Sequence, residues 1–312
     1  MHSALWWDDF EFGNGILTVK KTGARVPIEP GVIGDFLTWL PFYAVVESWR
    51  LKGVAQSAPK IWFAPDRPRP WYLVWAVMHA AGAEIAKSPE SADIVFHFED
   101  AITADATALP AGIPAINRDC ASIEKSHVAR VFEACFGYSL SVDPARWSGP
   151  MVVKSENNGT HDGRIIEGPC APEPGLVYQR VIDNRIERGL VEDLRCPTIG
   201  GSIPLVMHKR RRVENRFDNL NHEVAVSETE TVFTAREIEQ LSDFTRAMKL
   251  DWGGLDVLRD QTDGRIYVVD VNKTDMGPPI ALPLDDKIRV TRRLAEAFLD
   301  HLENGLNFYR DQ

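Results

Sequence analysis

The chain has 312 residues, 44% of them hydrophobic and 26% charged, a composition typical of a globular protein with one or two hydrophobic cores. Its 45 acidic residues outnumber its 35 basic residues and give a formal net charge of -10, which opposes binding to nucleic acid or to an anionic membrane. We therefore expect no nucleic-acid partner.

The four cysteines form no CxxC pair and have no histidines beside them at the spacing of a metal site, which indicates reduced thiols. Asp8 and Asp9 stand where a signal peptide would need an apolar segment. Together these features predict a cytoplasmic location.

Residues 1–57 are predicted to form an N-terminal extension, to which the sequence assigns no role. Its most apolar run, residues 32–49, contains two acidic residues and a proline, so we expect no transmembrane segment. The run predicts an aromatic helix that packs on the body of the protein. The alternative is that Trp39, Phe42 and Tyr43 form an exposed stripe that binds a partner or a membrane surface.

Residues 58–120 are predicted to form a small α/β domain. Short apolar runs predict three strands, at residues 60–64, 94–98 and 114–116. A helical pattern at residues 71–81 ends at Gly82. Strands that alternate with helices in this way favour a parallel sheet.

Residues 121–312 combine helices with a β-rich segment. Ser122 is expected to cap a helix over residues 122–136, with Lys125 in its first turn. Strands separated by glycine and proline turns are expected between residues 151 and 209, the last of them at residues 203–207. Further helices are predicted at residues 235–249 and 286–302, on either side of a β-hairpin.

The strongest chemical signal lies in that hairpin, whose strands carry Asp256 and Asp270. A loop with an odd number of residues centred on Asp263 would place these two aspartates opposite each other, with Asn272 on the same face. Facing carboxylates repel each other unless a cation lies between them, and this set of oxygen ligands suits Mg²⁺. The alternative is a two-residue turn at Asp263-Gly264, which would move Asp270 to the opposite face and leave a solvated hairpin.

Two other features suit an anionic ligand. Lys154 lies on a strand before a loop that contains Gly159 and Thr160, and backbone N–H groups of such a loop can share phosphate oxygens with the lysine. The basic run at residues 208–212 ends another strand, where side chains alternate between the two faces. The alternatives are a surface lysine and a solvated basic edge that discourages strand pairing.

The order of these segments resembles the ATP-grasp superfamily, and within it the branch of the ribosomal-protein glutamate ligases, over about residues 114–280. The resemblance rests on five segments in order: residues 116–125, residues 152–160, residues 177–183, residues 193–210 and the hairpin. It implies an α+β ATP-grasp fold preceded by the small α/β domain at residues 58–120. Within the ATP-grasp domain, it implies a lid-type subdomain at residues 121–182 and a metal-binding subdomain at residues 183–312.

The same resemblance implies a role for each candidate residue. Contacts with the nucleotide are implied for Lys125, Lys154, Gly159, Thr160, Gln179, the backbone near Ile182, and Asp193. Among these, Gln179 and Ile182 would meet the adenine and Asp193 the ribose. The remaining implied roles are a phosphate contact for Lys209 or Arg210, a contact near the acceptor for Arg216, and metal ligation for Asp256, Asp270 and Asn272.

Three positions depart from the family pattern. Position 270 carries Asp where the family usually has Glu, and Arg216 is displaced by one position. Gly254 stands where D-alanine:D-alanine ligase has an arginine, which implies that the oxyanion contact of that arginine is absent. The resemblance therefore leaves the substrate unidentified.

The implied activity is that of an ATP-dependent carboxylate-amine ligase, which would form an amide bond through an acyl phosphate and release ADP. Its cofactors would be ATP and Mg²⁺, with Mn²⁺ as a substitute. Its partners would be a small-molecule or peptide carboxylate and an amine, and an oligomer is compatible with the sequence. The alternatives are a kinase of the same fold, which would phosphorylate a hydroxyl group, and a non-catalytic ATP-binding module.

Overall fold

A small antiparallel sheet and a long helix open the chain. The computed structural model describes residues 6–20, 25–52, 58–104, 109–110, 112–156, 162–217 and 221–310, except for the side chains of residue 188 and residues 304–310. After a 3-10 helix at Trp6–Asp9, the elements are β1 (Phe10–Gly13), β2 (Ile16–Val19), β3 (Arg25–Pro27) and α1 (Pro30–Leu51). Asn14 and Gly15 join β1 to β2 with φ of 51° and 71°, the backbone that a two-residue hairpin turn requires.

Four parallel strands follow in the spatial order β5-β4-β6-β7. Their bounds are β4 (Lys60–Pro65), β5 (Glu84–Ile85), β6 (Ile94–Phe98) and β7 (Ala115–Ile116), and α2 (Leu73–Ala80) follows β4. The predicted parallel sheet and its three predicted strands are confirmed. Strand β5 was not predicted, because its two residues, Glu84 and Ile85, form no apolar run.

Helix α1 packs on α2 and on the C-terminal helix. Its Phe42 is buried against Trp75 of α2. The ring of Tyr43 stacks on its neighbours, with centroids 4.8 Å from Trp39 and 5.8 Å from Trp75. The predicted packed helix is therefore confirmed, and the alternative of an exposed aromatic stripe is wrong, because its central residue is buried.

Helix α3 (Lys125–Phe136) begins three residues later than predicted. Glu124 precedes its first residue, and Ser122 Oγ accepts a hydrogen bond from the backbone N–H of Glu124 at 3.2 Å. Ser122 therefore shapes the turn that leads into the helix, and its prediction as the N-cap was wrong. Gly137 ends the helix with a φ of 77°, a backbone conformation that glycine adopts without strain.

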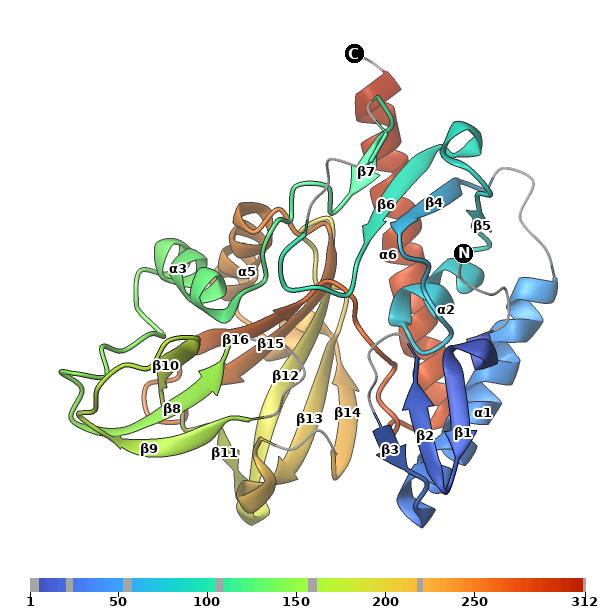
Figure 1. Cartoon of the computed structure of the whole chain (residues 1–312). Coiled ribbons are helices and arrows are strands. Elements are labelled where there is room, and N and C mark those ends of the chain that lie inside the picture. The colour runs from blue at the N-terminus through green and yellow to red at the C-terminus, as the bar shows by residue number, and fades with distance from the viewer. Residues whose placement is uncertain are drawn as a thin grey trace.

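The remaining chain contains two antiparallel sheets and three further α-helices (Figure 1). The lid sheet, in the order β10-β8-β9, consists of β8 (Gly149–Ser155), β9 (Arg164–Gly168) and β10 (Leu176–Arg180). The large sheet, in the order β14-β13-β12-β15-β16, consists of β12 (Leu190–Ile199), β13 (Val206–Arg212), β14 (Glu223–Ser227), β15 (Trp252–Arg259) and β16 (Ile266–Asn272), with β11 (Arg185–Ile186) on β12. The helices are α4 (Thr229–Val232), α5 (Ala235–Ala247) and α6 (Leu284–Arg310).

Strand β13 lies further along the chain than the predicted residues 203–207, and the basic run forms most of it. Pro204 precedes the strand, and a proline cannot donate a backbone hydrogen bond to a neighbouring strand. The pairing therefore starts at Val206 and continues to Arg212, where β13 lies between β12 and β14.

The large sheet has a hydrophobic core on each face. On one face, Leu194 and Leu255 pack with Phe132 of α3 and Phe244 of α5. On the other face, residues of β13 and β15 share a core with α6 and with the small parallel sheet. The polar side chains of the candidate site lie on this second face, beyond that shared core.

The predicted domain boundaries stay predictions, although each of the three units from residue 58 onward contains a sheet of its own. The small domain and α6 share one hydrophobic core, so residues 58–120 and the C-terminal helix bury each other's apolar side chains. Within the described residues, no helix is long and apolar enough to cross a membrane.

The side chain of Asn117 links the small sheet to the start of β15 through hydrogen bonds. Asn117 follows β7, is 1% exposed and has a φ of 58°. Its Oδ1 accepts hydrogen bonds from the backbone N–H groups of Asp251 and Trp252 at 2.9 Å and 3.0 Å, and its Nδ2 donates to the carbonyl oxygen of Trp252 at 2.8 Å. One buried side chain therefore satisfies three backbone groups of another domain.

We predict that Asn117→Ala lowers the free energy of unfolding by about 3 kcal/mol, because three buried backbone groups lose their partner and alanine disfavours a positive φ. The measurement is urea denaturation followed by circular dichroism. Asn14→Ala is the matched control, since Asn14 also has a positive φ of 51° but is exposed in a turn. A loss in Asn117→Ala no larger than in Asn14→Ala would contradict this role.

Candidate active site

The site is built on a row of charged side chains across three neighbouring strands. Asp256 of β15 lies directly opposite Asp270 of β16 and directly opposite Arg195 of β12. Residues that face each other across strands point to the same side of the sheet. The predicted pairing of the two aspartates is therefore confirmed.

The reason predicted for this pairing was wrong. Arg259 pairs with Ile266, so the loop at residues 260–265 has an even number of residues and would place Asp256 opposite Val269. The register shifts next to Asp256, and Val269 is left as an extra residue in a β-bulge. The bulge returns Asp270 to the face of Asp256.

Asp256 is surrounded by positive charge. Its Oδ1 lies 3.1 Å from Nη1 of Arg195 and 3.4 Å from Nζ of Lys209. Burial alone would raise the pKa of the Asp256 carboxyl, but the charges of Arg195 and Lys209 outweigh burial and hold this pKa well below its usual range. Asp256 is therefore an anion at neutral pH.

Asp270 is less well compensated. Burial raises the pKa of its carboxyl, against the opposing charges of Lys154 and Lys125. Its buried Oδ1 has no hydrogen-bond partner among the described residues. A buried carboxylate oxygen without a partner is costly, so this atom is suited to receive a cation.

The two predicted nucleotide lysines approach Asp270 from separate elements. Lys154 of β8 donates from Nζ to the carbonyl oxygen of Val269 at 3.0 Å, and burial lowers the pKa of this lysine. Lys125, the first residue of α3, donates from Nζ to the carbonyl oxygen of Glu156 at 3.2 Å. The structure therefore brings both lysines to the carboxylate pair. Gly159 and Thr160 lie outside the described residues.

The basic run of β13 divides between the two faces of the large sheet, because successive side chains of a strand alternate. Lys209 points to the face of Asp256. Arg210 pairs instead with Glu192 and Glu223, each at 2.9 Å. Of the two predicted phosphate contacts, only Lys209 lies beside the carboxylates.

The predicted hinge for adenine contains a buried amide group without a partner. Gln179 of β10 is 3% exposed, and its Nε2 has no hydrogen-bond partner among the described residues. The carbonyl oxygen of Ile182 accepts from Nη2 of Arg216 at 3.0 Å. Arg216, predicted near the acceptor, therefore lies at the hinge.

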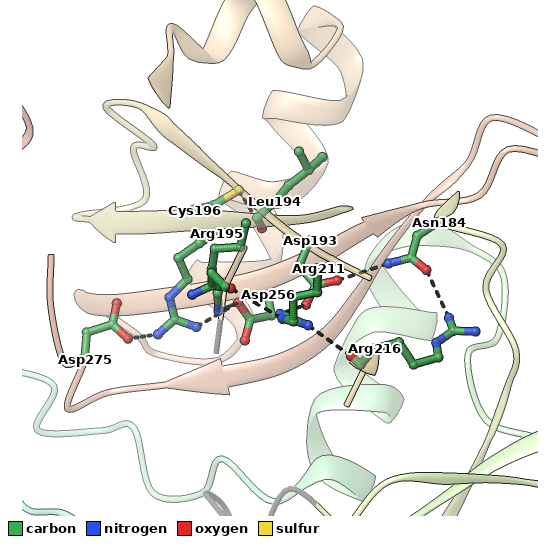
Figure 2. A network of polar contacts seen from close by, with 11 residues as sticks. Asn184, Asp193, Leu194, Arg195, Cys196, Arg211, Arg216, Asp256 and Asp275 are labelled. Carbon is green, nitrogen blue, oxygen red and sulfur yellow. Dashed lines mark hydrogen bonds and ion pairs between the residues drawn. The ribbon is translucent and has the colours of Figure 1, made fainter. Parts of the chain in front are cut away.

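A second network connects this hinge to the predicted ribose contact (Figure 2). Asp193 pairs with Arg211 of β13 and accepts from Nδ2 of Asn184 at 3.0 Å. Oδ1 of Asn184 in turn accepts from Arg216 at 3.0 Å. Burial raises the pKa of Asp193, and the charge of Arg211 opposes this rise. The structure thus brings Ile182, Asp193 and Arg216 together through two residues that were not predicted.

The predicted metal ligands fit a hard divalent cation in part. Asn272 of β16 uses Oδ1 to accept the backbone N–H of Thr274 at 2.8 Å. Within the described residues, no group of three His, Cys, Asp or Glu side chains could hold a metal ion. The predicted set has two carboxylates and one amide. Two facing aspartates, one with an unpartnered buried oxygen, still form the oxygen pair that Mg²⁺ prefers.

No family model and no curated protein matches this sequence, but solved structures match its fold. The ATP-grasp ligase PsnB in complex with minimal precursor, Mg and ADP matches with a TM-score of 0.52 at 14% identity, over 80% of this chain and 100% of that chain. The protein has the ATP-grasp fold. The predicted α+β fold is thereby confirmed, whereas the nearer likeness to the ribosomal-protein glutamate ligases stays a prediction.

Two further structures agree with this fold. PsnB in complex with precursor peptide PsnA2 and AMPPNP has a TM-score of 0.50 and 14% identity, over 78% of this chain and 96% of that chain. D-alanine–D-alanine ligase from Bacillus anthracis in complex with ATP has a TM-score of 0.51 and 15% identity, over 81% of this chain and 99% of that chain. At such identities the likeness extends to the fold and not to individual residues.

Three charged residues of the site were not predicted. Arg195 and Arg211 each lie two residues after a predicted site residue of the same strand, Asp193 and Lys209. The alternation of side chains places such residues on one face, so this signal was available in the sequence. Asp275 lies in the loop after β16, where no periodic pattern extends.

We predict that Asp193→Ala lowers the free energy of unfolding by about 3 kcal/mol, because it leaves the buried guanidinium of Arg211 without its counter-ion. The side chain of Arg211 is 7% exposed. Asp183→Ala is the control, because Asp183 pairs with Arg185, which is 65% exposed, and should cost less than about 1 kcal/mol. Equal losses in the two variants, measured by urea denaturation, would argue against a buried ion pair at Asp193.

Proposed function

We propose that this protein is an ATP-dependent carboxylate-amine ligase that forms an amide bond through an acyl phosphate and releases ADP. The observation that carries the proposal is the row of Arg195, Asp256 and Asp270 on one face of the large sheet, with Lys154 and Lys209 beside it. Facing carboxylates among several cations suit a divalent cation and the phosphates of a nucleotide.

Each residue has a distinct task in this proposal. Asp256 and Asp270, with Asn272, would hold Mg²⁺, which would bridge phosphate oxygens and neutralise their charge. Lys154 and Lys209 lie beside these carboxylates and would bind phosphate oxygens as the transferred group moves towards the carboxylate. Positioning of the two reactants is the main contribution of the protein, since phosphoryl transfer requires little covalent chemistry from side chains.

The nucleotide base would lie at the hinge between the two sheets. Nε2 of Gln179, which has no partner among the described residues, and the backbone near Ile182 offer hydrogen-bonding groups to adenine. Arg211 and Asn184 bind different oxygens of Asp193, and a ribose hydroxyl would donate to a second lone pair of one of these oxygens. Lys125 adds positive charge from the start of α3.

The classes of carboxylate and amine substrate are inferred from proteins that share the fold. PsnB was solved with a precursor peptide, and D-alanine–D-alanine ligase acts on a small molecule, so the fold serves both substrate sizes. We extend both classes to this chain as candidates for the carboxylate and the amine. The four cysteines are unpaired, which supports the proposed cytoplasmic location.

Calorimetric titration with ATP, with and without Mg²⁺, tests the nucleotide site. We expect binding to the wild type to need Mg²⁺ and to weaken at least about tenfold in Asp270→Asn, because that variant removes one negative charge from the cation. Asp263→Asn is the matched control, since Asp263 is an exposed aspartate in the loop of the same hairpin. It should bind as the wild type does.

Binding would justify a screen of carboxylate and amine pairs for ADP release. A ligase releases inorganic phosphate with the ADP, whereas a kinase retains the phosphate on a hydroxyl group of its product. A wild type that binds no ATP with or without Mg²⁺ would end the assignment.

The two faces of β13 give a second test. We predict that Lys209→Ala lowers the rate of ADP release by about 100-fold, because a cation next to the phosphates stabilises the charge of the transition state. Arg210→Ala should change this rate less than about threefold, since Arg210 pairs with Glu192 and Glu223 on the face of the sheet opposite to Asp256. Equal losses in the two variants would contradict the orientation of β13 described here.

A further inference from the structure

Arg195 lies between two carboxylates of the site, one on each side of its guanidinium group (Figure 2). Nη1 lies 3.1 Å from Oδ1 of Asp256, and Nη2 pairs with Asp275. The side chain of Arg195 is 11% exposed and that of Asp275 is 2% exposed. Because Arg195 is also the direct strand partner of Asp256, the backbone register fixes this placement.

Gly254 has no side chain, and the guanidinium of Arg195 and the carboxylate of Asp275 occupy the space where one would lie. A Cβ atom at position 254 would lie 2.8 Å from both Cζ and Nε of Arg195 and would also collide with Oδ2 of Asp275. Since such a distance is far below van der Waals contact, any other residue would displace the guanidinium or the carboxylate. The glycine is needed here for space.

The same oxygen atom of Asp256 serves two protein cations. Arg195 and Lys209 approach Oδ1 at 3.1 Å and 3.4 Å. A divalent cation on this carboxylate would face both positive charges at short range, where little water screens them. A divalent cation that binds Oδ1 would therefore displace Arg195, Lys209 or both.

We propose that Arg195 is the counter-cation of Asp256 in the nucleotide-free protein and makes the binding of a divalent cation depend on the nucleotide. This inference rests on the proposed function and describes how its metal site is regulated. Without a nucleotide, the displaced cations gain no anion in place of Asp256, since Asp275 already pairs with Arg195. Phosphate oxygens supply that anion, so Arg195 and Lys209 leave Asp256 only when metal and nucleotide arrive together. Asp275 holds Arg195 at the site throughout.

Titration of the full-length protein with Mn²⁺ in the absence of nucleotide tests this inference. Free Mn²⁺ is measured by electron paramagnetic resonance, for the wild type and for Arg195→Gln. We expect Arg195→Gln to bind Mn²⁺ at least about tenfold more tightly than the wild type, because a positive charge next to Asp256 is gone. Addition of ADP should strengthen Mn²⁺ binding more in the wild type than in the variant.

Four further variants identify the cause. Gly254→Ala retains the charge of Arg195 but fills the space where its guanidinium meets Asp275, so the guanidinium should lose its position beside Asp256 and Mn²⁺ binding should again tighten. Arg195→Lys should stay within about threefold of the wild type, because the charge remains. In Arg195→Gln combined with Asp256→Asn the gain should disappear. Arg212→Gln is the matched control, since the side chain of Arg212 is 66% exposed, and it should leave Mn²⁺ binding unchanged.

Mn²⁺ binding by folded Arg195→Gln that equals or falls below that of the wild type would overturn the inference. So would the absence of Mn²⁺ binding by every variant. If Arg195→Gln fails to unfold cooperatively, Gly254→Ala and Arg195→Lys decide the outcome. The inference requires Gly254→Ala to bind Mn²⁺ more tightly than Arg195→Lys. The nucleotide-free Mn²⁺ titration and the ATP titration have separate readouts, so failure of this inference can be distinguished from failure of the proposed function.

Discussion

The placement of Asp256 opposite Asp270 is the constraint on which the rest of the site depends. Two carboxylates on adjacent strands repel each other and weaken the sheet unless positive charge lies near. Here that charge comes from three different strands, as Arg195 of β12, Lys209 of β13 and Lys154 of β8. The carboxylate pair therefore gathers in one place the cations that the phosphates of a nucleotide require, and the sheet is stabilised by the same groups that would bind the ligand.

The bulge at Val269 connects this constraint to the arrangement of the two sheets. It turns Asp270 to the face of Asp256, and it leaves the carbonyl oxygen of Val269 to accept the ammonium group of Lys154 from the lid sheet. A regular hairpin would pair Asp256 with Val269, and Asp270 would point into the core beneath α3. One extra residue thus sets both the register of the acidic pair and the contact between lid and large sheet.

The sequence predicted the features that depend on repeating patterns. The parallel sheet and the long helices follow from periods of two and 3.6 residues, whereas the shared face of Asp256 and Asp270 depends on the bulge. It could not predict the bulge, because an extra residue interrupts the period without changing the composition around it. It left Lys209 and Arg210 undecided, since alternation shows that they point in opposite directions but not which one faces the carboxylates. Ser122 was misassigned because a serine before a helix can shape the preceding turn as readily as it caps the first one.

Gly254 stands where D-alanine:D-alanine ligase has an arginine, but a comparison of this one sequence position misses an arginine that a neighbouring strand contributes. Side chains of adjacent strands project into the same volume, so a group can be contributed from either strand. Position 254 of β15 has no side chain, and the guanidinium of Arg195 from β12 fills the space above it, held there by Asp275. The site therefore has an arginine next to Asp256 although the sequence has none two residues before it. The charge of the site therefore depends on the register between β12 and β15, because this register decides which side chains of the two strands lie next to Asp256.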